Sequence, residues 1–367
     1  MLLLVVLSSS VTTSAGLKLT QAPAHGRTAS VVMRGTRPKK APAAKKAKVS
    51  RTKAQSKVAR PHVAAPAPTE EEVRERHMQT ICAVATEHAN ALADGLERHG
   101  YAVVDGFLAE ATISTMRAEC ASLLRDKRMI ASESTRWNDA TGNVETYQKD
   151  NVFSYNLKGG AEYEHAPRLT EYCVALVSTL PKLLNARFPE AALSDRVHTN
   201  KLAVCLGEGS HYAKHYDNSG GADLRKLTVL VYLQTPRHEL SDGGEFRMFT
   251  EDVAAGAGAA DGAGAADGAI AADGAGATMT RGVDEDGGGL PYVDIAPIGG
   301  RLLAFWSDTM VHAVRPSLAD PADEARHRWA LTIWMHTDEA AAIRYDADAE
   351  ARHFPGLQSG AAGALTG

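Results

Sequence analysis

Three residues of this 367-residue chain have the types and spacing to bind one metal ion. His215 and Asp217 are two positions apart, so on a β-strand their side chains leave the same face. His312 follows the apolar residues 302–306 and a turn-like Ser-Asp-Thr, and a later strand would bring it back to the same place. Two neutral imidazoles and one carboxylate, with other positions open, are the ligands of non-haem Fe(II) sites. A bare His-x-Asp also occurs by chance in surface loops, so its surroundings must support the hypothesis.

A strand pattern near the C-terminus carries a candidate anion-binding residue. Within residues 328–334 the alternation puts Arg328, Thr332 and Trp334 on one face and large apolar residues on the other. Such a strand is buried on both faces, and a buried guanidinium needs an anionic partner because an unpaired buried charge is costly. A dicarboxylate co-substrate would be such a partner. The alternative is a structural ion pair with a carboxylate of the protein.

Whole segments of the chain, rather than isolated residues, resemble a known family. They occur in this order: residues 100–108, 212–218, 227–233, 243–249, 294–297, 301–308, 312–316 and 328–334. Together they resemble the catalytic domain of the prolyl 4-hydroxylase superfamily, and they are most similar to its EGL-nine type, the hypoxia-inducible-factor prolyl hydroxylases. The resemblance extends, with gaps, over residues 90–338.

The resemblance assigns roles to the residues already named. It implies that His215, Asp217 and His312 bind Fe(II), and that Arg328 pairs with the C5 carboxylate of 2-oxoglutarate. It also implies that Tyr232 helps to bind that carboxylate. No catalytic side chain is implied beyond the metal centre.

Other positions match the family less closely or depart from it. Thr332 and Trp334 match residues that line the 2-oxoglutarate pocket; without the resemblance both would be ordinary core residues. Asp150 matches an acidic residue of a mobile substrate loop, with Arg225 as its expected partner, although two solvated surface charges would give the same pattern. Leu206 stands where the family has a tyrosine near the metal, which puts oxygen affinity and substrate choice in question.

The function that the resemblance implies is that of a dioxygenase dependent on Fe(II) and 2-oxoglutarate. Such an enzyme consumes O2, hydroxylates a prolyl residue of a protein or peptide, and releases succinate and CO2, while L-ascorbate keeps the iron reduced. One alternative is an oxygenase of the same mechanism with a non-prolyl substrate. Another is a non-catalytic jelly-roll protein that senses 2-oxoglutarate or binds peptide.

The order of the predicted elements indicates the fold. Helical periodicity marks residues 70–99, 110–125 and 169–184, and a strand is predicted at residues 101–104. Later strand signals are short and separated by Gly, Pro and Asp turns; they cover residues 202–206, 227–233, 246–249, 292–295, 302–306 and 329–334. We therefore expect a mostly β fold with flanking α-helices, the antiparallel double-stranded β-helix or jelly-roll. Residues 131–158 are either a hairpin that caps the core or a lid over a peptide.

Charge divides the chain into unequal parts. Residues 1–68 contain 13 Lys and Arg and no Asp or Glu, so the other 27 basic residues accompany all 44 acidic ones. The acidic remainder argues against nucleic acid as the substrate of the catalytic part. The apolar start and the basic tract after it predict targeting to the secretory pathway or an organelle. The alternative is a retained basic arm, either solvated or binding nucleic acid, in the cytoplasm or nucleus.

The predicted organisation has three parts. Residues 1–68 form the basic segment, residues 69–338 the catalytic domain and residues 339–367 a tail with one possible helix at 339–352. Within the domain, residues 251–290 are rich in Ala, Gly and Asp and are expected to be a disordered insertion. The four cysteines are widely spaced, so neither a zinc site nor a disulfide framework is expected. No membrane span is expected in the mature protein.

Overall fold

The computed structural model describes residues 67–138, 143–250, 279–284, 289–344 and 346–354. Its α-helices are α1 (Glu70–His99), α2 (Glu110–Arg125), α3 (Pro167–Asn185) and α4 (Ala347–His353). Its strands are β1 (Tyr101–Val104), β2 (Ile130–Asn138), β3 (Asn143–Asn156), β4 (Leu193–Cys205), β5 (Ser210–His215), β6 (Arg225–Tyr232), β7 (Phe246–Phe249), β8 (Met279–Asp284), β9 (Leu290–Ile295), β10 (Leu302–Trp306), β11 (Val311–Ser317) and β12 (Arg328–Thr337).

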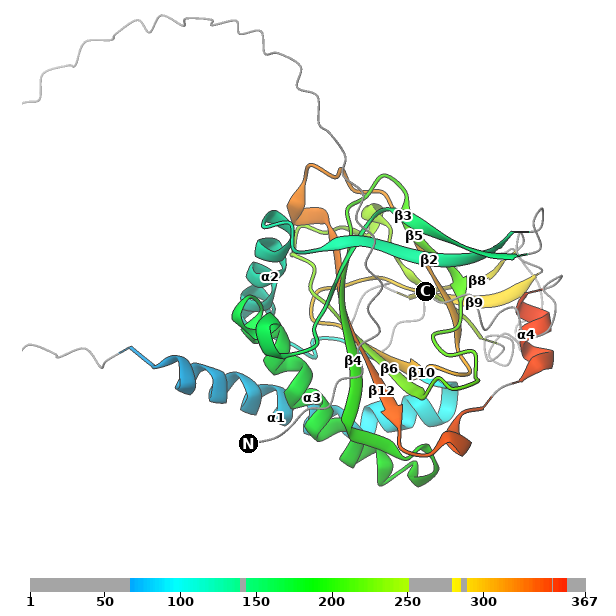
Figure 1. The fold of residues 1–367 in the computed structure, drawn as a ribbon, viewed down its shortest axis with the longest axis horizontal. Coiled ribbons are helices and arrows are strands. Elements are labelled where there is room, and N and C mark those ends of the chain that lie inside the picture. The colour runs from blue at the N-terminus through cyan, green and yellow to red at the C-terminus, as the bar shows by residue number, and fades with distance from the viewer. Residues whose placement is uncertain (1–66, 139–142, 251–278, 285–288, 345, 355–367) are drawn as a thin grey trace, which may run out of the picture. The chain divides into compact units, whose positions relative to one another are not determined.

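The strands form two antiparallel sheets (Figure 1). The larger sheet has the order β1-β10-β6-β12-β4-β3-β2, and the smaller has the order β5-β11-β7-β9-β8. Side chains from both sheets form a shared apolar cluster that includes Leu230, Phe305, Phe246, Met248 and Val314. The architecture confirms the predicted jelly-roll with flanking helices.

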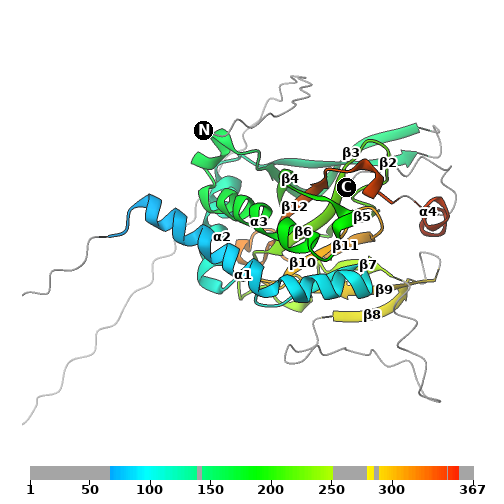
Figure 2. The same ribbon diagram turned by 90° about the horizontal axis from the view of Figure 1, so that it is seen from below.

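Helices α1, α2 and α3 cover the outer face of the larger sheet. Figure 2 shows α1 and α3 side by side, and α1 also contacts β1 and β10 while α3 contacts β4 and β12. The core between helices and sheet contains Leu92, Leu176, Leu202, Val229 and Leu331, all inaccessible to solvent. This layer holds the larger sheet rigidly from behind, so its other face can carry a site.

Both ends of α1 follow from its sequence. At the start, the Thr69 hydroxyl accepts a hydrogen bond from the Glu72 N–H, and the Glu72 carboxylate accepts one from the Thr69 N–H. These two bonds form a capping box. At the other end Gly100 has φ of 75°, and its N–H donates to the Leu96 carbonyl. Glycine adopts this left-handed conformation at no steric cost, so the chain turns there directly into β1.

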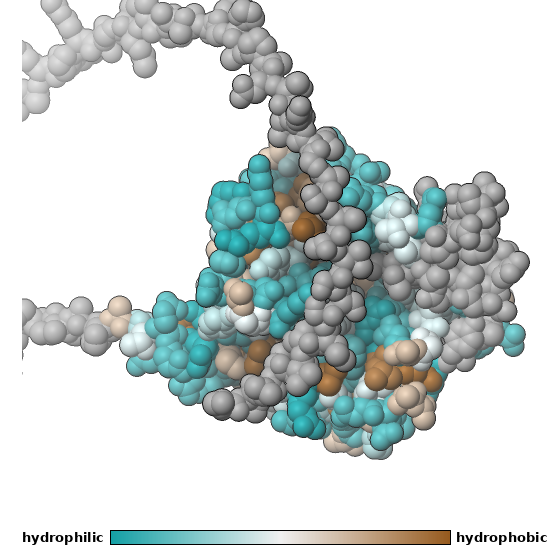
Figure 3. Space-filling view, in the orientation of Figure 1, coloured by the Kyte–Doolittle hydropathy of each residue, from teal (hydrophilic) through white to brown (hydrophobic). Residues whose placement is uncertain are grey.

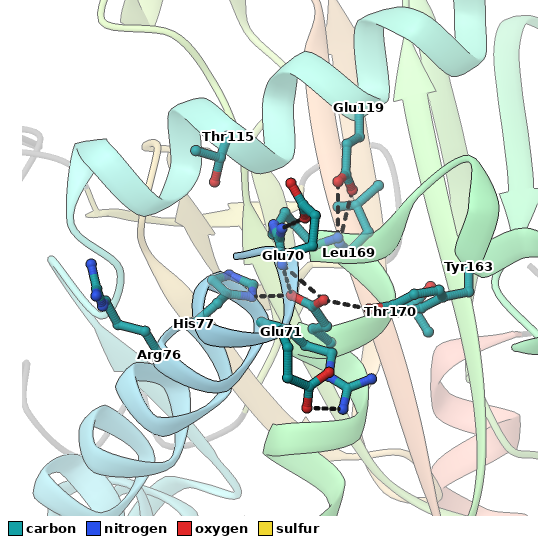
Figure 4. A network of polar contacts seen from close by, with 12 residues as sticks. Glu70, Glu71, Arg76, His77, Thr115, Glu119, Tyr163, Leu169 and Thr170 are labelled. Carbon is teal, nitrogen blue, oxygen red and sulfur yellow. Dashed lines mark hydrogen bonds and ion pairs between the residues drawn. The ribbon is translucent and has the colours of Figure 1, made fainter. Parts of the chain in front are cut away.

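A buried polar network ties the three helices together (Figure 4). The Glu171 carboxylate of α3 accepts hydrogen bonds from the Tyr163 hydroxyl at 2.8 Å and from Arg168, and it lies 3.0 Å from Nδ1 of His77 on α1. Glu119 of α2 accepts the backbone N–H groups of Arg168 and Leu169 at the start of α3, at 2.8 and 3.0 Å. Glu119 therefore satisfies two amides at the N-terminus of α3 that lack partners within the helix, while Glu171 joins side chains of α1 and α3.

Two predictions about the last third of the chain need correction. Residues 279–284 were expected to belong to a disordered insertion, but they form β8, which pairs with β9 through main-chain hydrogen bonds. A helix over residues 339–352 was also wrong in extent, because helix α4 spans only Ala347–His353. The Arg344 N–H donates to Asp308 Oδ2 at 2.7 Å, and the Asp346 carboxylate caps the helix start. The basic segment 1–66 and residues 251–278 lie outside the described residues.

On the face drawn in Figure 3, the described residues are mainly hydrophilic, with hydrophobic residues in small separate patches. None of the described helices combines the length and the apolar character needed to cross a membrane. All four cysteines are free thiols, which agrees with the absence of a predicted disulfide framework.

Candidate metal centre

The smaller sheet brings the three predicted ligands together. His215 at the end of β5 lies directly opposite His312 near the start of β11. Asp217 was expected on the same strand as His215, but it lies two residues beyond the end of β5. The candidate ligand atoms of the three residues all lie within 4.8 Å of one another, and all three side chains are buried. This spacing matches a single ion bound by three ligands.

Backbone carbonyls determine which nitrogen of each histidine faces the centre. Nδ1 of His215 lies 2.7 Å from the Ala213 carbonyl, and Nδ1 of His312 lies 3.1 Å from the Met310 carbonyl. A carbonyl oxygen can only accept, so each Nδ1 must carry the proton. Both Nε2 atoms are then lone-pair donors, and each lies 3.8 Å from Oδ1 of Asp217.

Two hydroxyl groups hold the Asp217 carboxylate. Thr228 of β6 donates from Oγ1 to Oδ2 of Asp217 at 2.6 Å, and Ser307 Oγ lies 2.8 Å from the same Thr228 oxygen. This contact occupies Oδ2 and leaves Oδ1 facing the histidines. Hydrogen bonds of this kind orient metal ligands. Sequence reasoning did not find Thr228 or Ser307, which stand in an ordinary apolar strand and an ordinary turn.

The electrostatics favour the ligand form of all three side chains. Burial and then the charge of the neighbouring His312 lower the pKa of His215 to about 3. Burial also lowers the pKa of His312. Burial opposes ionisation of Asp217, but attraction to the two imidazoles and the Thr228 hydrogen bond lower its pKa overall. At neutral pH the centre therefore offers two neutral imidazoles and one carboxylate, the state in which these groups bind a divalent cation.

Aromatic rings enclose the His312 imidazole. The ring of Phe246 stacks on it with centroids 4.8 Å apart and planes 15° apart, and Phe305 lies at the same centroid distance on a tilt. These contacts restrict the orientation of His312 and exclude water from one side of the centre.

Arg328 lies in the wall of the same cavity without an acidic partner. The cavity is lined by His215, Asp217, Thr228, His312, Arg328, Thr332 and Trp334, among others. Arg328 is 3 % exposed, and its Nε donates to the Gly244 carbonyl at 2.6 Å. No carboxylate of the described residues forms an ion pair with it. The structural ion pair considered from the sequence is therefore absent from the described part of the chain.

Tyr232 lies next to Arg328 with a buried and unsatisfied hydroxyl. The guanidinium carbon lies 5.2 Å from the Tyr232 ring centroid, and the hydroxyl has no hydrogen-bond partner among the described residues. Arg328 lines the cavity and the Tyr232 hydroxyl is buried beside it; a buried cation and a buried donor are costly unless an anion joins them. These residues fit one end of a dicarboxylate, while the His and Asp side chains fit a metal ion.

A comparison with known families agrees with this geometry. Residues 201–336 match the 2OG-Fe(II) oxygenase superfamily. The chain carries a 2OG-Fe(II) oxygenase domain. The matched segment contains His215, Asp217, His312 and Arg328.

The oxygenase domain also has individual relatives. Egl nine homolog 1 of Homo sapiens is 24 % identical over 267 residues, which is 70 % of this chain and 46 % of that protein. Hypoxia-inducible factor prolyl hydroxylase of Caenorhabditis elegans is 29 % identical over 153 residues, 40 % of this chain and 15 % of that protein. A prolyl hydroxylase structure from Trichoplax adhaerens, in complex with a hypoxia inducible factor peptide, has 19 % identity and a TM-score of 0.48; the match covers 76 % of this chain and 98 % of that one. The chain spans about half the length of human Egl nine homolog 1.

Two expectations about the rim of the oxygenase site are not met. Arg225 was paired with Asp150, but its guanidinium binds Asp223, with Nε 2.8 Å from Oδ2, and Asp150 is exposed. Leu206 was expected near the metal, yet it packs against the core on the helical side of the larger sheet. Its neighbour Cys205 belongs instead to the cluster between the sheets. The alternation of side chains along β4 explains this, because adjacent residues point to opposite faces.

Proposed function

We propose that this chain is an Fe(II)- and 2-oxoglutarate-dependent dioxygenase that hydroxylates prolyl residues of a protein or peptide, with release of succinate and CO2. The observation that carries the proposal is one cavity lined by two complementary kinds of group. It holds the cluster of His215, Asp217 and His312 together with Arg328, which has no acidic partner among the described residues. A molecule with one metal-binding end and one anionic end fits such a cavity.

The metal ligands have clear roles in this proposal. Nε2 of His215, Nε2 of His312 and Oδ1 of Asp217 would hold Fe(II) and leave neighbouring coordination positions open. The iron supplies the oxidising power when bound. Thr228 keeps the Asp217 carboxylate turned toward the ion. The carbonyls of Ala213 and Met310 keep both imidazoles in the tautomer that can bind it.

The remaining cavity residues would bind and orient the co-substrate. Arg328 and the Tyr232 hydroxyl would donate charge-assisted hydrogen bonds to the far carboxylate of 2-oxoglutarate. Thr332 and Trp334 line the same cavity. Phe246 and Phe305 keep water away from one side of the metal centre.

The assignment of a prolyl substrate is supported by the names of the relatives. Several are prolyl hydroxylases by name, and one is a hypoxia-inducible factor prolyl hydroxylase. The β2–β3 hairpin adds a physical argument, because Lys149 of β3 contacts Tyr212 in the cavity wall. A hairpin at this position can cover a bound peptide and exclude water during the reaction.

The test measures succinate formation by the full chain with Fe(II), 2-oxoglutarate and ascorbate, with and without proline-containing peptides. We expect peptide-stimulated turnover and a mass gain of one oxygen on proline. His312→Ala removes a proposed ligand and should abolish both signals. His211→Ala is the matched control, since His211 is exposed and outside the cluster. If 2-oxoglutarate turns over but no proline peptide stimulates it, the prolyl assignment fails. If the chain does not bind iron, the oxygenase proposal itself fails.

A further inference from the structure

Two lysine side chains lie beside the metal centre without acidic partners. Lys149 on β3 is 6 % exposed, and its Nζ has no hydrogen-bond partner among the described residues. This Nζ lies 3.9 Å from the ring centroid of Tyr212, which lines the cavity. Lys201 on β4 also lines the cavity. In the described part of the chain, the lysines that form ion pairs are Lys182 and Lys226, not these two.

The backbone of Lys201 lies away from the proposed site of the far 2-oxoglutarate carboxylate. Across the β4–β12 pair, Cys205 is in register with Arg328, and Lys201 is in register with Thr332. These two pairs are four residues apart, which corresponds to about 13 Å of strand. A five-carbon diacid anchored at Arg328 is shorter than this separation. Lys201 Nζ lies 5.6 Å from the ring of Trp334.

The charge balance leaves these two cations only partly compensated. Fe(II) and 2-oxoglutarate carry equal and opposite charges, and Asp217, which attracts both lysines, carries one negative charge against the positive charges of Arg328, Lys149 and Lys201. A net positive charge therefore remains when both groups are bound. Burial and then the positive charge of Lys201 lower the pKa of Lys149 to about 7. Burial also lowers the pKa of Lys201. An anion brought in by the substrate would relieve this cost.

We propose that Lys149 and Lys201 bind a carboxylate of the substrate. The enzyme would then select a proline that has a carboxylate close to it. The inference rests on the proposed function. The carboxylate has two sources: an Asp or Glu side chain near the target proline, or the free carboxylate of proline itself. Either source can accept charge-assisted hydrogen bonds from the two ammonium groups. The rings of Tyr212 and Trp334, close to Lys201 at 5.8 and 5.6 Å, provide flat walls for a pyrrolidine ring.

Binding of matched ligands tests the proposal without turnover. The full chain is loaded with Mn(II) and 2-oxoglutarate under nitrogen, and dissociation constants are measured by calorimetry. One set of peptides contains the same proline and compares Glu with Gln at a single position. The position is varied over the two residues before and the two residues after the proline. A second pair compares L-proline with L-prolinamide. We expect the acid form of one pair to bind at least about tenfold more tightly than its neutral form.

Variants assign that preference to the lysines. The double variant Lys149→Met/Lys201→Met should lose it, and Lys149→Arg/Lys201→Arg should retain it because the charge remains. Lys158→Met is the matched control, since Lys158 is exposed and its loss removes one surface charge. The comparison of acid and neutral ligands on the native chain needs no variant, so a variant that fails to fold does not remove the test.

Several results would overturn the proposal. One is equal affinity for the acid and neutral forms of every ligand pair, and another is a preference that survives in the methionine variant. A variant that loses affinity for 2-oxoglutarate by the same factor would assign the lysines to the co-substrate.

If Mn(II) and 2-oxoglutarate bind but no proline ligand does, the prolyl assignment fails. Glu peptides with Ala in place of proline then decide the lysine proposal: lysine-dependent binding supports it, and no binding overturns it.

Discussion

Thr228 on β6 donates a 2.6 Å hydrogen bond to Oδ2 of Asp217, so a residue of the larger sheet orients a ligand attached to the smaller one. The variant Thr228→Val keeps the side-chain shape and removes the donor. We expect its affinity for Mn(II) to fall about 10- to 100-fold, because the carboxylate loses the contact that orients it. Titration followed by electron paramagnetic resonance measures this, with Thr228→Ser as the control that keeps the hydroxyl. An unchanged affinity in the valine variant would remove Thr228 from the site.

Arg328→Met should separate ligand binding from stability. Removing the guanidinium leaves the far carboxylate of 2-oxoglutarate buried without its cation, so we expect affinity for 2-oxoglutarate to fall at least about 30-fold. The ligand-free variant should unfold at the same temperature as the native chain or higher, because an unpaired buried charge has been removed. Calorimetry and thermal unfolding measure the two effects. Arg315→Met, at an exposed position, is the control and should change neither.

Gly244→Ala should disturb the same pocket by pressing on the Arg328 side chain. Gly244 has φ of 76°, and an added Cβ would lie 2.7 Å from Cδ of Arg328. Gly209 has φ of 82° and open space around its Cβ position, so Gly209→Ala carries only the backbone strain. We expect Gly209→Ala to cost about 1 to 2 kcal/mol of stability. Gly244→Ala should cost more and also weaken 2-oxoglutarate binding. Equal losses in urea unfolding for the two variants would argue against a clash with Arg328.

Glu119 should make stability depend on pH. Burial raises its pKa from 4.5 to about 7, despite the hydrogen bonds from the Arg168 and Leu169 amides. The fold therefore favours the neutral carboxyl, and this stabilisation is present below about pH 4.5 and lost as the pH rises through about 7. Urea unfolding at pH 5 and pH 8 should show a larger decline for the native chain than for Glu119→Gln. Glu87→Gln, at an exposed position, should behave like the native chain.

The metal residues could be found from the sequence because their types are rare in strands and their order is distinctive. The two histidines and Asp217 are polar residues among apolar runs, and the structure brings them together. Their supports could not be found in this way. Thr228 contacts Asp217 only because β6 and the end of β5 meet in space, and such a meeting depends on long-range strand register. Lys149 was overlooked for the same reason, since nothing local distinguishes a lysine of a polar hairpin from a solvated one.

The errors at the C-terminal end have a similar origin. Alanine-rich sequence favours a helix over residues 339–352, but the Asp308 carboxylate binds the Arg344 N–H and keeps that residue out of one. Strand β8 carries little apolar surface, so its pairing with β9 comes from the main chain. Sequence patterns report propensity and side-chain burial, and these two features depend on contacts with distant backbone or side-chain groups.

His215 and His312 lie opposite each other on the paired strands β5 and β11, so an ion bound to both would constrain the chain between them. β5 is the last strand of its sheet and has one neighbour there, β11, although almost one hundred residues separate the two histidines in sequence. An ion bound to both would act as a cross-link that closes this loop. By the estimate used for disulfides, closing a loop of about 100 residues removes about 4 to 5 kcal/mol of unfolded-chain entropy. An ion bound to both histidines would therefore also stabilise this edge strand against unfolding, in addition to its chemical role.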